Sequence, residues 1–139
     1  MRYVVDASIV VKWYVPEVHS AEAERLLDPA NDLHAPDLIV PEVGNIIWKK
    51  IGRGELTEKE GGMIVAAFLG VSVVKHPMTP LLKPAFEGAS RSAQTVYDWT
   101  YFALALSLGC RMVTADEKFF KALRGGPLAA NLLWVADIP

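Results

Sequence analysis

Short apolar segments alternate with helical segments along the whole of this 139-residue chain, and this alternation decides which folds it can adopt. Segments with strand character end at a proline, an acid or a polar turn, and they cover residues 2–5, 33–36, 71–77, 110–116 and 131–137. Helical spacing begins at residue 7 or 8 and is found again over residues 19–27, 38–51, 57–69, 80–91, 96–108 and 117–123. Strands separated by helices are joined by right-handed crossovers, which give parallel sheets covered on both faces. The pattern predicts one α/β domain over residues 1–139, a three-layer α/β/α sandwich with a mainly parallel central sheet.

Composition and charge narrow the class of protein. Hydrophobic residues make up 52% of the chain, which is enough for a well-filled core. The apolar runs are too short to cross a bilayer, and the opening residues MRYVVDASIV lack the cleavage pattern of a secretory leader. With a single cysteine, Cys110, no internal disulfide forms, so we expect a cytoplasmic protein without membrane contact. Because the net charge is −2, any surface for nucleic acid must be a local basic patch.

Four acidic residues lie just after predicted strands or in the first turn of predicted helices. They are Asp6 in VVDAS, Glu42 in PEVGN, Asp98 in VYDWT and Asp116 in VTADEKF. Each alone has an ordinary explanation, because an acid at such a place caps a helix or interacts with its dipole. In a parallel sheet, however, the carboxyl ends of the strands meet at one edge, so we expect the four carboxylates to converge. Converging carboxylates raise one another's pKa and repel unless a cation lies among them.

The chemistry of this predicted cluster favours a hard cation. Zinc-type Cys/His spacing, a Gly-rich phosphate loop and a G-x-S-x-G turn are all absent from the chain, and oxygen ligands alone suit Mg²⁺ or Mn²⁺. The hydroxyls of Ser8 and Thr114 and the amide of Asn45 are placed near the acids to orient them or a water. An ion of this kind activates water for phosphodiester hydrolysis. The residues therefore predict a metal-dependent nuclease.

In this order, the segments VVDAS, PEVGNIIWK, VYDWTYFALAL and VTADEKF resemble the PIN-domain nucleases, above all the small VapC-type toxins of type II toxin–antitoxin pairs. The resemblance covers nearly the whole chain. It implies a Mg²⁺- or Mn²⁺-dependent endoribonuclease whose acidic quartet is Asp6, Glu42, Asp98 and Asp116. Ser8 and Thr114 match the hydroxyl positions that accompany this quartet in the family. For the mechanism we expect Asp6, Asp98 and Asp116 to hold the metal, directly or through water.

The resemblance also implies partners. These are an RNA substrate, a second copy of the chain in a homodimer, and a small antitoxin of the VapB type that inserts an Arg or Lys into the acidic pocket. Lys118 and Lys121 flank the turn that holds Asp116 and are the basic residues expected nearest to RNA. Further candidates for phosphate contacts are Lys12, Lys49, Lys50, Arg53, Arg91 and Arg124. The helical pair 38–51 and 57–69 lies between two strands and is expected to project as a contact surface.

Other functions stay open at this point. In a catalytically inactive PIN-like protein-interaction domain, the four acids would be helix caps only. A receiver-type phosphotransfer domain needs an aspartate after the central strand, and VSVVKHP offers none. A phosphatase with an aspartyl nucleophile has a second aspartate two residues on, where this chain has Ser8. The presence of all four acids favours the nuclease, because converging charge is costly without a use.

Overall fold

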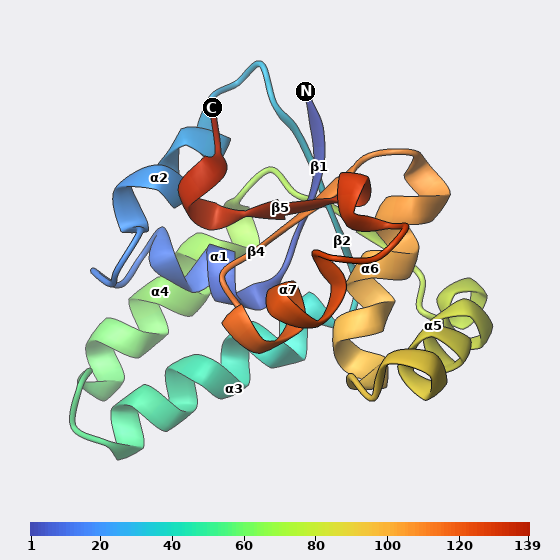
Figure 1. Ribbon diagram of the computed structural model, residues 1–139. Coiled ribbons are helices and arrows are strands. Elements are labelled where there is room, and N and C mark those ends of the chain that lie inside the picture. Colours follow the sequence, from blue (N-terminus) through green and yellow to red (C-terminus); the bar gives the residue numbers. More distant parts are fainter.

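The computed structural model describes residues 1–139 as a single sheet between two layers of helices (Figure 1). The five strands are all parallel and lie in the order β3-β2-β1-β4-β5. Their bounds are β1 Arg2–Val5, β2 Asp32–Pro36, β3 Val74–His76, β4 Arg111–Thr114 and β5 Leu132–Trp134. The predicted α/β/α sandwich is confirmed, with a sheet that is parallel throughout.

The helices divide between the two faces of the sheet as right-handed crossovers require. They are α1 Ala7–Lys12, α2 Ser20–Glu24, α3 Ile39–Gly52, α4 Glu58–Gly70, α5 Thr79–Ser92, α6 Val96–Leu108 and α7 Glu117–Leu123. Helix α1 contacts α2 and α3, and α3 contacts α4, so these four form one layer (Figure 1). On the other face α6 packs on β1, β2 and β4, with α5 outside it. None of the helices has the length and apolar content needed to cross a membrane.

The core is densest around α6, whose residues 99–105 are all buried. Trp99 and Phe102 of this helix are tilted against each other, and both meet Phe119 of α7 edge-on, which ties the two helices together. Gly88 lets α5 approach α6 closely, because a Cβ at this position would lie 2.2 Å from Cε3 of the Trp99 ring. This packing fixes the start of α6, and therefore Asp98, relative to the sheet.

The structure shortens three predicted elements. Strand β3 covers only residues 74–76 of the expected 71–77, because Val73 is buried in the core without pairing to β2. Strand β5 covers only residues 132–134 of 131–137, since the chain then turns into a 3₁₀ helix over Val135–Asp137. The expected helix 19–27 is α-helical only as α2 and ends in a 3₁₀ turn over Arg25–Leu27. A run of apolar residues indicates that a segment is buried, but it does not show that the segment pairs with a neighbouring strand.

Helices α3 and α4 extend side by side away from the sheet, as predicted (Figure 1). Their connection uses Gly54 at φ +75°, and α4 begins with a capping box between Thr57 and Glu60. Trp48 on α3 is 68% exposed, whereas Phe68 of α4 is buried in the core. The projecting pair of helices therefore offers the exposed ring of Trp48 as a contact.

Candidate active site

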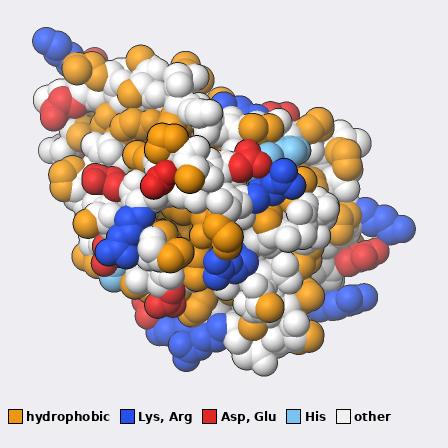
Figure 2. All heavy atoms as spheres, turned by 90° about the horizontal axis from the view of Figure 1, so that it is seen from above, with side chains coloured by type: hydrophobic (Ala, Val, Ile, Leu, Met, Phe, Trp, Pro, Cys, Tyr) orange, Lys and Arg blue, Asp and Glu red, His pale blue; other side chains and the backbone are white.

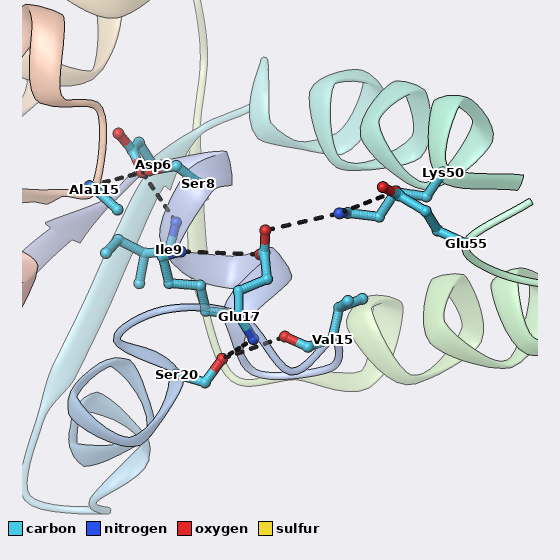
Figure 3. Close-up of polar contacts among 10 residues, drawn as sticks. Asp6, Ser8, Ile9, Val15, Glu17, Ser20, Lys50, Glu55 and Ala115 are labelled. Carbon is cyan, nitrogen blue, oxygen red and sulfur yellow. Dashed lines mark hydrogen bonds and ion pairs between the residues drawn. The ribbon is translucent and has the colours of Figure 1, made fainter. Parts of the chain in front are cut away.

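Asp6 lies at the carboxyl end of β1 and caps the start of α1. Its Oδ1 accepts hydrogen bonds from the backbone N–H of Ile9 (3.1 Å) and the hydroxyl of Ser8 (2.5 Å) (Figure 3). Its Oδ2 accepts one from the hydroxyl of Thr114 (2.5 Å). The pKa of Asp6 is raised to about 6, because burial and the nearby charge of Asp98 raise it by more than these three hydrogen bonds lower it. The carboxylate is thus fully hydrogen-bonded and still lacks a positive partner.

The two predicted hydroxyls join the ends of neighbouring strands β1 and β4. Besides bonding Asp6, the Ser8 Oγ accepts the backbone N–H of Ala115 at 3.1 Å, and the Thr114 Oγ1 accepts that of Asp116 at 3.0 Å. The Asp116 Oδ1 then caps α7 by accepting the backbone N–H of Phe119 at 3.1 Å. These bonds engage the backbone N–H groups of Ala115 and Asp116, and the turn holds Asp116 at the same edge as Asp6.

Asp98 begins α6 in a reciprocal cap with Thr95. The Thr95 Oγ1 accepts the backbone N–H of Asp98 at 3.1 Å and donates its own hydrogen to Asp98 Oδ2 at 2.9 Å. Burial first, and then the charge of Asp116, raise the pKa of Asp98, while the bond from Thr95 and the charge of Lys118 lower it. The hydrogen bonds of the helix cap offset part of the cost of burying Asp98. The second oxygen of the Asp98 carboxylate has no protein partner.

Glu42 lies in the first turn of α3 and is the least satisfied of the four acids. Its Oε1 is buried without a hydrogen bond. Burial raises the pKa of Glu42 to about 7, and the charges of Asp6 and Asp98 add to the rise. An acid in this state binds a proton or a cation readily at neutral pH.

Tyr101 of α6 belongs to the same cluster and was missed by the sequence interpretation. Its buried hydroxyl makes no hydrogen bond of ordinary geometry, although it lies close enough to Glu42 to lower the pKa of that carboxyl. Burial, followed by the charges of Glu42 and Asp6, raises the pKa of Tyr101. Its position three residues after Asp98 places both on one helical face, and this spacing was the signal available in the sequence.

Glu42 and Asp98 open together into a hollow of about 430 Å³. The predicted Asn45 also lines it, together with Thr95 and Tyr97. The ring of Tyr97 is 65% exposed at this place. The structure therefore brings Glu42, Asn45 and Asp98 to one concave surface, with Asp6 and Asp116 near enough to influence their charges.

The cluster is strongly negative, and the charge of Lys118 compensates it only in part, by lowering the pKa of Asp98. None of the ion pairs in the structure involves Asp6, Glu42, Asp98 or Asp116. No three His, Cys, Asp or Glu side chains lie close enough together to hold one metal ion directly. The donors are all oxygens and include the unpaired Oε1 of Glu42. They fit a hard cation that keeps several of its waters and binds one or two carboxylates directly, as Mg²⁺ does.

The two lysines expected nearest to RNA differ in their surroundings. Lys118 lies close enough to Asp98 to lower the pKa of its carboxyl. Lys121 is bound to Glu117 one helical turn away, with Nζ and Oε1 2.5 Å apart at an exposed position. Lys118 therefore faces the acidic cluster, whereas Lys121 is engaged on the outer surface of α7.

The family model described as PIN domain matches residues 3–125. The chain belongs to the PIN-domain family. It is 39% identical over 122 residues to "Ribonuclease VapC3" of Pyrobaculum aerophilum, covering 85% of this chain and 92% of that protein. It is 33% identical over 115 residues to "Ribonuclease VapC12" of Mycobacterium tuberculosis, covering 83% and 87% of the two chains.

The fold of this PIN domain is shared with solved structures. The crystal structure of PAE2754 from Pyrobaculum aerophilum matches with a TM-score of 0.73 and 22% identity, over 98% of this chain and 85% of that chain. VapBC2 from Rickettsia felis, solved bound to a DNA fragment from its promoter, matches with a TM-score of 0.63 and 13% identity, over 96% and 97%. At these identities the likeness establishes the architecture of the PIN domain.

Proposed function

We propose that this PIN domain is an endoribonuclease that hydrolyses RNA with the help of Mg²⁺ or Mn²⁺ and acts as the toxin of a toxin–antitoxin pair. The observation that carries the proposal is the only partly compensated carboxylate cluster at the carboxyl edge of the sheet. Glu42 and Asp98 have raised pKa values there and no ion-pair partner. The named ribonucleases VapC3 and VapC12, aligned over most of this chain, support RNA as the substrate.

Each residue of the acidic cluster has a separate role in the proposed reaction. Asp6, Asp98 and Asp116 are the proposed holders of the ion, directly or through water. When bound, the ion supplies an activated water and neutralises the charge that develops on the phosphate. Ser8 and Thr114 hold Asp6 in one orientation by their hydrogen bonds. Glu42, whose pKa of about 7 lies near neutral pH, is suited to orient the attacking water and accept its proton.

The proposal includes two protein partners. A VapB-type antitoxin with an Arg or Lys side chain would supply the counter-charge that the acidic cluster lacks, and the structural likeness to a VapBC complex supports this partner. Large apolar side chains on α3, α4 and α5 are more than half exposed and offer surfaces for the antitoxin and for a homodimer. They are Trp48, Met63, Leu69, Leu82 and Phe86.

The test is cleavage of end-labelled total RNA by the purified chain, with Mg²⁺, with Mn²⁺ and with EDTA. We expect discrete products that require the metal and a rate about 10²- to 10⁴-fold lower in Asp98→Asn, because one charged ligand is lost. Asp137→Asn, a change of the same chemistry at an exposed position, is the control. Circular dichroism verifies that both variants fold. A wild-type rate in folded Asp98→Asn would overturn the proposal.

A further inference from the structure

A second hollow, of about 390 Å³, adjoins the acidic cluster between α1 and α3. Four of its nine lining residues are Lys or Arg and one is an acid, although the whole chain has a net charge of −2. The cationic residues are Lys12 from the end of α1 and Lys49, Lys50 and Arg53 from the end of α3. We refer to this hollow as the basic pocket.

The basic pocket shares a wall with the acidic cluster. Ser8 and Ala115 line the pocket, and the same Ser8 hydroxyl donates to Asp6 and accepts the Ala115 N–H (Figure 3). The two sites are therefore separated by a single side chain. A ligand that lies over Asp6 reaches the basic pocket without leaving the surface.

The lysines in this pocket are held in place by a shared carboxylate. Lys12 and Lys50 are largely buried, with side chains 12% and 13% exposed. Glu17 lies between them, at 3.9 Å from the Lys12 Nζ and 3.7 Å from the Lys50 Nζ. Lys50 also pairs with the half-exposed Glu55 at 3.6 Å, and Figure 3 shows it between Glu17 and Glu55. Both distances from Glu17 exceed those of a close charge-assisted hydrogen bond, so Glu17 balances the two ammonium groups without saturating them.

Figure 2 shows the edge where both chain ends lie, and there basic and acidic side chains are interspersed. The basic pocket lies beside the acidic cluster, because Ser8 lines the pocket and donates to Asp6. Val11 and Ile46 add apolar wall to the pocket, which suits a sugar or base attached to the charged group.

On the basis of the proposed function, we infer that the basic pocket binds a backbone phosphate of the RNA, adjacent to the phosphate that is cleaved over Asp6. Lys12 and Lys50 contact this phosphate, which takes the place that Glu17 occupies between them. Lysines at such a place supply affinity that is independent of sequence and depends on salt. The pocket also attracts the substrate toward carboxylates that would otherwise repel it.

The experiment uses a short RNA that spans one cleavage site mapped in the total-RNA digest, and follows single-turnover cleavage by the full chain. In Lys12→Gln/Lys50→Gln we expect the half-saturating RNA concentration to rise about tenfold while the maximal rate changes little. The plot of log affinity against log salt should become shallower by about 1.4. Lys59→Gln/Lys83→Gln, which removes two exposed lysines on α4 and α5, should leave both quantities unchanged. Lys12→Arg/Lys50→Arg should retain most of the affinity.

A single methylphosphonate in the RNA identifies the phosphate. A neutral linkage next to the scissile one should weaken binding to the wild type and have no further effect on Lys12→Gln/Lys50→Gln. If the wild type cleaves and this double variant binds RNA equally well, the inference is wrong and the pocket serves another ligand, such as an acidic segment of the antitoxin. If the wild type does not cleave RNA, the proposed function itself is overturned.

Discussion

The acidic cluster and the basic pocket lie on either side of Ser8 and balance their charges in opposite ways. In the cluster, Asp6 and Glu42 have pKa values raised to about 6 and about 7, and no lysine or arginine pairs with them. In the pocket, Glu17 already stands between Lys12 and Lys50. The cluster therefore depends on a cation from outside, while the pocket contains a counter-ion that a phosphate can displace.

This difference assigns separate tasks to the two regions. Unbalanced charge lowers the stability of the folded state, and this stability is regained when an ion binds. The cluster is therefore suited to bind a cation tightly and specifically. Charge that is balanced by a loosely held neighbour costs little and exchanges easily. Specific chemistry belongs to the first region, and steering and holding of the substrate backbone belong to the second.

The comparison is tested most strongly by the pH dependence of stability. The pKa of Asp6 rises from 3.8 to about 6 on folding, so the folded state binds more protons and loses stability as pH rises through that range. Without metal, this loss is about 2–3 kcal/mol for Asp6. Glu42 acts in the same direction up to about pH 7, with solvent screening its contribution.

Bound Mg²⁺ should remove this penalty, because it neutralises the carboxylates. We therefore expect saturating Mg²⁺ to raise the free energy of unfolding by about 2 kcal/mol more at pH 8 than at pH 5. Urea titrations with Mg²⁺ and with EDTA at each pH measure the difference, and acids elsewhere in the chain cancel. In Asp98→Asn the gain at pH 8 should shrink. An equal effect of Mg²⁺ at both pH values would mean that the acids are helix caps only.

A smaller effect is expected from Thr114, which is fully buried and serves both ends of the β1–β4 junction. Thr114→Val keeps the shape but removes the donor to Asp6 and the acceptor of the Asp116 N–H. We expect the free energy of unfolding to fall by about 2 kcal/mol, because buried polar groups lose their partners. The pKa of Asp6 should rise further, since the lost bond favoured its charged form.

Thr100→Val is the matched control for this variant. Thr100 is also buried, but its hydroxyl bonds only to the Val96 carbonyl of its own helix, so its loss should cost clearly less. Urea unfolding of the three proteins in EDTA compares the two changes. Equal costs would show that the junction around Asp6 is no more strongly organised than an ordinary helix turn.

Local sequence patterns were sufficient for the parts of the site that local geometry determines. The T-x-x-D spacing at Thr95 and Asp98 identifies a helix cap, and the cap forms as expected. The alternation of strands and helices indicates one edge for Asp6, Glu42 and Asp116, because the carboxyl ends of parallel strands lie together, and the packing of α6 on the sheet adds Asp98. The predicted lengths of β3 and β5 were too long because local patterns indicate burial only. Both are edge strands, and apolar residues beside them are buried without pairing to another strand.

Contacts between distant segments were beyond the reach of that reasoning. The sequence offered Lys12, Lys49, Lys50 and Arg53 as separate candidates, and only the packing of α1 against α3 brings them around one hollow. The missing partner of Tyr101 is likewise a property of the fold, because it depends on how α3 approaches α6. Which of many surface charges act together is a tertiary property, and spacing along one helix does not encode it.

The smallest effect we expect is also the one that separates the two regions most directly. In Glu17→Gln the basic pocket loses its internal counter-ion but keeps all four cationic residues. Removing a competitor that contributes about 0.2–1 kcal/mol should strengthen RNA binding by about 1.4- to fivefold, with a steeper salt dependence. Glu24→Gln changes the net charge equally at an exposed position outside the pocket and should leave affinity unchanged. Fluorescence anisotropy with labelled RNA, in the Asp98→Asn background to prevent cleavage, measures both. Weaker binding by Glu17→Gln would show instead that Glu17 is needed to hold the lysines in place, and the pocket would then need its own acid in order to bind RNA.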